Sequence, residues 1–151
     1  MQYTHLIKHF KDLSPAELYA FLRLRNEVFV VEQNCSYQDA DNKDLFCHHL
    51  MVFNGKELIG YARIVPPGVS FNEMSVGRVV TSATARGTGA GKLLMELAVS
   101  YCLNLFGPAA IRIGAQLYAK GFYEALGFVL TGDTYDEDGI EHVEMIRYPT
   151  L

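Results

Sequence analysis

The chain has 151 residues, half of them hydrophobic and a fifth charged, and a formal net charge of −4. This length suits one domain with a sizeable core, and the lack of any basic run excludes a general nucleic-acid-binding protein. The longest apolar runs, such as residues 28–31, are far too short to span a bilayer, so we expect no membrane partner.

The cysteines and the N-terminal stretch bear on the cellular compartment. Cys35, Cys47 and Cys102 are odd in number and show no C-x-x-C spacing, a pattern that favours a reduced environment. The N-terminal stretch is polar and contains no apolar signal-peptide core. We therefore expect a cytoplasmic protein.

The first helix is clearly marked. Residues 1–12 carry only a weak strand pattern, but Ser14, Pro15 and Glu17 form an N-cap, a first helical position and a capping box. The helix then presents one hydrophobic stripe and ends in a bulky apolar run, followed by two polar residues. The residues of this stripe and run are Leu18, Phe21, Leu22, Val28, Phe29, Val30 and Val31, and the polar pair is Glu32 and Gln33.

Arg25 falls in the middle of that stripe, whereas Arg23 falls on the opposite, solvent side. A buried charge without a partner is costly. Two alternatives stay open: Arg25 is a core residue paired with an acidic side chain, or the helix borders a cleft and Arg25 binds a carboxylate or phosphate of a substrate.

Two segments raise the question of a metal. Residues 34–44 form an acidic loop whose D-x-D-x-x-D spacing suggests calcium, but the EF-hand glycine and final glutamate are missing, so a solvated loop is favoured. His48 and His49 are adjacent in a predicted strand and point to opposite faces, which favours structural histidines. We expect no metal.

The remainder of the chain alternates strands and helices. Two strands, 48–53 and 57–65, are joined at Asn54-Gly55, a strong hairpin signal. A strand at 74–81 is followed by a helix that stops at Gly107-Pro108 and buries Leu94, Leu97, Ala98, Tyr101 and Leu105. Next come a strand at 110–115 and a helix at 117–126 followed by Gly127. An antiparallel strand pair at 128–133 and 142–147, joined through the polar loop 136–139, completes the chain. This order predicts an α/β fold with a mixed sheet, helices on its faces and a ligand at the carboxyl end of a central strand.

A glycine-rich loop, Arg86-Gly87-Thr88-Gly89-Ala90-Gly91-Lys92, joins the 74–81 strand to the following helix. Backbone N–H groups at a helix N-terminus lack intrahelical partners and attract anions, so this loop is a candidate phosphate or pyrophosphate site. Neither the Walker pattern nor the dinucleotide G-x-G-x-x-G pattern fits it.

The spacing Arg86-x-x-Gly89-x-Gly91 resembles the acetyl-CoA loop of the GNAT N-acetyltransferases. About thirty residues later, Phe122-Tyr123-Glu124-Ala125-Leu126-Gly127-Phe128 resembles the F-Y-x-x-x-G-F ending of that family. Three further segments, 24–33, 39–41 and 138–142, resemble the ElaA-like subgroup. The resemblance implies one GNAT domain over residues 1–151, with a mostly antiparallel central sheet of about six to seven strands and helices on both faces.

The resemblance also implies acetyl-CoA as co-substrate. The loop residues Arg86, Gly87, Thr88, Gly89, Ala90, Gly91 and Lys92 would hold its pyrophosphate, and the backbone of Val79, Val80 and Thr81 would pair with the pantetheine arm. Tyr123 matches the general acid that protonates the departing thiolate, although it could instead simply pack beside Phe122 and Phe128. A phenol with a pKa near 10 stays neutral at pH 7 and can donate this proton.

The general base and the acceptor are less well defined. Glu73, Glu32 and His142 are rival bases, and a water relay is a further alternative. Candidate substrate-binding residues are Arg25, Gln33 and His142. The acidic residues Asp39, Asp41, Asp136, Glu137 and Asp138 are expected to border the acceptor entrance and to favour a small cationic amine.

The leading hypothesis is an N-acetyltransferase that acts by direct transfer on a primary amine of a small molecule. An acyl-CoA-binding regulatory module without turnover is the alternative, and a homodimer stays open for either. An acyl-homoserine-lactone-type synthase is a third alternative, but the R-x-x-G-x-G loop argues against it.

Overall fold

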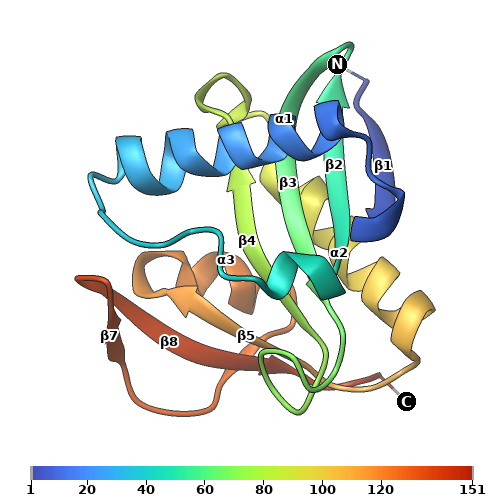
Figure 1. Ribbon diagram of the computed structural model, residues 1–151. Coiled ribbons are helices and arrows are strands. Elements are labelled where there is room, and N and C mark those ends of the chain that lie inside the picture. Colours follow the sequence, from blue (N-terminus) through green and yellow to red (C-terminus); the bar gives the residue numbers. More distant parts are fainter. Residues whose placement is uncertain (1, 151) are drawn as a thin grey trace.

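The computed structural model describes residues 2–150, so both end residues of the predicted 1–151 domain lie outside the described range. Within that range the strands form two four-stranded arrays that meet side by side (Figure 1). The first array is antiparallel with the order β1-β2-β3-β4, and the second has the order β5-β8-β6 with β7 also paired to β8. The strands are β1 (Thr4–His9), β2 (His48–Asn54), β3 (Glu57–Val65), β4 (Ser75–Thr81), β5 (Ile111–Gln116), β6 (Val129–Leu130), β7 (Tyr135–Glu137) and β8 (Ile140–Arg147).

Helices cover both faces of the first array. Helix α1 (Pro15–Arg25) crosses one face of β2, β3 and β4, and α2 (Ala90–Phe106) lies on the other face (Figure 1). The predicted capping box is present, because the Ser14 hydroxyl accepts from the backbone N–H of Glu17 while the Glu17 carboxylate accepts from that of Ser14. A shorter α3 (Lys120–Glu124) lies beside the second array. The mixed, mostly antiparallel GNAT-like architecture with helices on both faces is therefore confirmed, although the described residues form eight strands in two arrays where about six to seven strands in one sheet were predicted.

Alternation along the strands divides the core in two. Leu50 and Val52 of β2 face α2, whereas Met51 between them faces Phe21 and Leu24 of α1. Each face of the sheet is thus sealed by one helix. The residues that line the candidate site lie at the edge of the first array, where β4 faces β5 of the second.

Several element boundaries differ from the sequence expectation. The first helix ends at Arg25 and continues as a π-helical segment, η2 (Asn26–Glu32). Leu105 is 41% exposed, so its predicted burial was wrong. The buried stripe of α2 follows Leu94, Ala98 and Cys102, and Phe106 extends it at the last turn in place of Leu105.

The C-terminal part contains shorter elements than expected. The predicted 117–126 helix consists of a 3-10 turn, η5 (Leu117–Ala119), followed by α3, and Gly127 at φ +95° follows it as predicted. The prediction of a polar loop at 136–139 was only partly right, because β7 extends to Glu137 and β8 starts at Ile140, which leaves residues 138–139 as the turn. The remaining 3-10 turns are η1 (Phe10–Asp12), η3 (Lys43–Phe46) and η4 (Ala83–Ala85). Within residues 2–150, helix length and hydropathy together rule out a membrane-spanning helix.

Candidate active site

The two arrays separate next to a single parallel bridge. Met74 pairs with Ile111, and the N–H of Arg112 donates to the Met74 carbonyl at 3.0 Å. Beyond this bridge β4 and β5 diverge, and a cleft of about 280 Å³ opens between them. Its walls come from five places: residues 76–79 of β4, residues 113–116 of β5, the segment after η2, the neighbourhood of Tyr123, and the β7–β8 turn.

A bulge in β4 shapes one wall of this cleft. Gly77 pairs with Arg63 and Val80 pairs with Tyr61, so Arg78 and Val79 together lie opposite the single residue Ala62. Arg78 has a positive φ of 52°, in the left-handed region that non-glycine residues rarely adopt. Since bulges turn backbone groups out of the ladder, β4 presents an irregular free edge to the cleft. An extended ligand can add to such an edge.

The glycine loop has the geometry of an anion site. Gly87 and Gly89 have φ values of +77° and +86°, and a Cβ added at either would meet no atom within 4 Å. Helix α2 starts at Ala90 with no side-chain cap, so its first N–H groups point to the open loop. Thr88 anchors the loop, because its hydroxyl donates to the Ala85 carbonyl at 2.5 Å and accepts from Tyr3 at 3.0 Å.

The loop also carries cationic side chains. Arg86 Nη1 lies 2.6 Å from Glu32 Oε1, and both side chains are 44% exposed. Lys92 is exposed, with Nζ 3.9 Å from Glu96. Glu32 lies in η2 and does not line the cleft that contains Tyr123, so its carboxylate is not placed to act there as a base.

Tyr123 lies in α3 and lines the cleft. Its ring packs edge-on against Phe122 at 5.1 Å and Phe128 at 6.0 Å, so the packing role weighed from the sequence is present as well. Burial, with a smaller contribution from Tyr118, raises the pKa of Tyr123 to about 12. The phenol is therefore neutral near pH 7 and can donate a proton.

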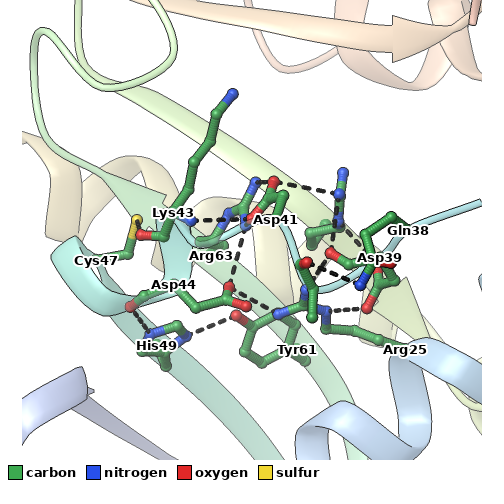
Figure 2. Close-up of polar contacts among 12 residues, drawn as sticks. Arg25, Gln38, Asp39, Asp41, Lys43, Asp44, Cys47, His49, Tyr61 and Arg63 are labelled. Atoms are coloured by element: carbon green, nitrogen blue, oxygen red, sulfur yellow. Dashed lines mark hydrogen bonds and ion pairs between the residues drawn. The ribbon is translucent and has the colours of Figure 1, made fainter.

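Arg25 is fully buried and belongs to an ionic network under α1 (Figure 2). Its Nε lies 2.9 Å from Asp39 and its Nη1 lies 2.8 Å from Asp44. Burial alone lowers the pKa of Arg25, but the Tyr61 hydroxyl, Asp44 and Asp39 outweigh it and raise the value. The structure thus shows the ion-paired alternative for Arg25, and its side chain lies outside the cleft lining.

The same network neutralises the acidic loop. Arg63 bonds to Asp41 and Asp44, and Arg78 lies 2.9 Å from Asp39. Although burial raises the pKa of Asp41, the hydrogen bonds and charge of Arg63 lower it to about 2. Asp39 and Asp41 consequently hold the loop against the sheet and do not offer free negative charge to an acceptor. The loop still reaches the cleft through its neighbours Tyr37 and Gln38.

Glu73 is held by Arg112, whose Nε and Nη2 donate to its two carboxylate oxygens at 3.0 and 2.9 Å. These hydrogen bonds lower the pKa of Glu73. The Glu73 carboxylate lies outside the cleft lining, next to the Met74–Ile111 bridge that joins the two arrays. Its position therefore argues for a structural role and against a role as base.

Gln33 and His142, the candidate substrate-binding residues, both line the cleft, together with partners that the sequence did not suggest. The side-chain amides of Gln33 and Gln116 bond to each other at 3.3 and 3.4 Å across the cleft. The Cys35 thiol donates to the Asp138 carbonyl at 3.2 Å. The one sequence signal for Gln116 as a cleft residue was its position at the end of a predicted strand, because strand ends meet at one edge of a sheet.

Among residues 2–150, no group of three or more His, Cys, Asp or Glu side chains could hold a metal ion. His49 is buried instead: its ring stacks on Phe21, and its two ring nitrogens bond to the Tyr61 hydroxyl and the Asp44 carbonyl. His48 lies edge-on to His9. Both contacts are those of structural histidines.

A cleft at splayed strands, with a free strand edge, an open glycine loop and a partly buried phenol, defines a transferase for an extended, phosphate-bearing donor. The family model described as "Acetyltransferase (GNAT) domain" matches residues 11–148. The chain belongs to the GNAT acetyltransferases, and its co-substrate is an acyl-CoA.

The known relatives place the chain in the ElaA-like group. Protein ElaA of Escherichia coli K12 is 39% identical over 141 residues, which are 92% of each chain. The crystal structure of Escherichia coli ElaA superposes with a TM-score of 0.91 at 36% identity, covering 97% of this chain and 99% of that one. An acyl-CoA N-acyltransferase from Pseudomonas aeruginosa gives a TM-score of 0.92 at 40% identity with the same coverage. The predicted family and subgroup resemblance is confirmed.

Proposed function

We propose that the protein transfers an acetyl group from acetyl-CoA to a primary amine of a small molecule, by direct attack and with Tyr123 as general acid. The observation that carries this proposal is the divergence of β4 from β5 beside Tyr123. It leaves a strand edge for an extended thioester and a proton donor in the same cleft.

The co-substrate would bind along two features already described. The N–H groups of Gly87 to Gly91, with the side chains of Arg86 and Lys92, suit the pyrophosphate. The pantetheine arm would add to β4 near Val79, while Val80 and Thr81 keep their pairing with Tyr61 and Gly60 of β3 on the other side. A backbone N–H turned out by the bulge would polarise the thioester carbonyl.

The reaction then needs three proton transfers. A neutral amine attacks the carbonyl carbon, and the tetrahedral intermediate collapses as the carbon–sulfur bond breaks. Tyr123 gives its phenolic proton to the thiolate, and the nascent amide nitrogen returns a proton to the tyrosinate. The products are the N-acetyl amine and the free thiol of CoA, and the proton taken from the acceptor ammonium goes to solvent through a base.

The acceptor would be a small cationic amine. Asp39 and Asp41 contribute little to this preference, because arginines neutralise them. Glu137 and Asp138 line the cleft and supply the negative side of the pocket, and Gln33 with Gln116 can hold polar groups of the acceptor. We propose one domain over residues 1–151, which acts as a monomer or a homodimer. A reducing compartment such as the cytoplasm is consistent with the three free, buried cysteines.

An acyl-CoA-binding module without turnover is the second candidate, because Glu73 and Glu32 are each tied to an arginine outside the cleft. Two measurements decide between them: acetyl-CoA binding by calorimetry, and free-thiol release over a panel of small amines. Binding with thiol release on at least one amine supports the enzyme. Binding without release on any amine supports the module, and loss of both refutes the proposal.

A further inference from the structure

His142 has its two ring nitrogens in different roles. It lies on β8 opposite Gln116 of β5, is 8% exposed and lines the cleft. Nδ1 lies 2.8 Å from the carbonyl of Ile140, and since a carbonyl only accepts, Nδ1 must donate. Nε2 is therefore the nitrogen that can take up or release a proton.

Glu137 faces that second nitrogen. Its Oε2 lies 3.2 Å from His142 Nε2, and its side chain is 58% exposed. A carboxylate at this distance stabilises the imidazolium once Nε2 is protonated. Because Glu137 is largely solvated, a proton held by the pair has a direct way out to water.

Tyr135 holds the imidazole from another side. It comes from β7 and pairs with His142 in the ladder, and its ring lies 5.7 Å from the imidazole with a 30° tilt. Its hydroxyl reaches over Gly114 of β5, where an added Cβ would lie only 2.7 Å from that oxygen. Gly114 thus leaves the room that the Tyr135 hydroxyl occupies while the Tyr135 ring lies against His142.

We infer that His142 is the general base that deprotonates the acceptor ammonium, and that Tyr135 and Glu137 position it. This inference rests on the proposed function. With the exposed Glu137 side chain turned to solvent, the neutral Nε2 of His142 is open to the acceptor. One N–H bond of the ammonium then breaks as its proton moves to Nε2, and the ammonium nitrogen keeps the electron pair for attack. Glu137 stabilises the imidazolium, which then returns its proton to solvent. Within residues 2–150, the ionisable side chains in contact with the ring are those of Glu137 and Tyr135.

Imidazole rescue tests the catalytic role. In His142→Ala, kcat/KM for a working amine should fall about 10²–10⁴-fold with acetyl-CoA affinity retained, since a general base contributes about that much. Added imidazole should restore part of kcat in this variant and none in Tyr123→Phe. An active wild type whose His142→Ala variant keeps its activity, or loses it without rescue, overturns the inference alone. A wild type that releases no thiol from acetyl-CoA with any amine overturns the proposed function, and the inference with it.

Glycine substitutions test the positioning role. Gly114→Ala should lower kcat about 10–100-fold, since small displacements of a catalytic group are costly, and the double variant Gly114→Ala/Tyr135→Phe should recover part of that loss because the crowded hydroxyl is gone. Gly132→Ala is the matched control, because an added Cβ there meets no atom within 4 Å. If Gly114→Ala behaves like this control, or if the double variant recovers nothing, Tyr135 does not position His142. Retained imidazole rescue in Gly114→Ala/His142→Ala checks that the cleft itself still admits ligands.

Discussion

The ion pair between Glu32 and Arg86 joins the π-helical segment η2 to the first position of the glycine loop, at 2.6 Å. The segment after η2 forms a wall of the cleft, so this contact links the acceptor side to the co-substrate side. A phosphate of the co-substrate would compete with Glu32 for the same guanidinium.

Removing the Glu32 carboxylate should therefore tighten acetyl-CoA binding. We expect Glu32→Gln to lower the Kd for acetyl-CoA several-fold and Arg86→Ala to raise it about tenfold, since a hydrogen bond to a charged group is worth about 1.5–3 kcal/mol. Stability should change by at most about 1 kcal/mol in Glu32→Gln, because both side chains are substantially exposed. Calorimetry and urea unfolding measure these effects. Glu27→Gln, on the same segment, is the matched control, and an equal Kd in both variants would refute the competition.

Tyr123→Phe should remove proton donation while keeping the ring packing against Phe122 and Phe128. We expect kcat to fall about 10²–10⁴-fold with unchanged acetyl-CoA affinity. Because burial raises the pKa of Tyr123 to about 12, the phenol stays protonated below that value, and wild-type activity should show no loss from Tyr123 ionisation up to about pH 10. Tyr148→Phe, at an exposed tyrosine, is the control. Unchanged kcat in Tyr123→Phe would remove the general-acid role.

Arg25→Ala should be strongly destabilising. It leaves Asp39 and Asp44 without one of their cationic partners in a buried site, and breaking a buried pair costs about 3–5 kcal/mol. Arg23→Ala, two residues away on the exposed side of α1, should change stability by no more than about 0.5 kcal/mol. Urea unfolding gives both free energies. Similar values for the two variants would show that the network contributes little.

Stability should fall as the pH drops from about 6.5 to 4, in part because of His49. Burial lowers the pKa of His49 to about 4, below the ordinary histidine value of about 6.5. In this window the unfolded chain binds a proton that the folded protein does not, so acid favours unfolding; full stability is present above 6.5, and the loss amounts to about 3 kcal/mol at most. Unfolding free energies at pH 7, 6, 5 and 4 should decline less steeply in His49→Gln. Parallel curves for the variant and the wild type would contradict this origin.

Features encoded by short stretches of sequence were predictable. The capping box at Ser14 and Glu17, the turn at Asn54-Gly55 and the open loop at Gly87 and Gly89 each depend on a few neighbouring residues. The loop and Tyr123 could likewise be recognised because their spacing along the chain is a family signature. Boundaries failed where local signals were weak, as in β7, whose three residues carry no alternation.

The sequence by itself determined the family, the order of elements, and the loop and phenol that a CoA-dependent transferase needs. Only the tertiary structure decided which charged side chains form ion pairs and which are available to a ligand. Arg25 meets Asp39 and Asp44, 14 and 19 residues away, and Glu73 meets Arg112, 39 residues away. Such pairings depend on how strands and loops pack, because long-range contacts follow from the three-dimensional arrangement and have no periodicity in the chain. The divergence of β4 from β5, and the contact between Glu137 and His142, arise in the same way.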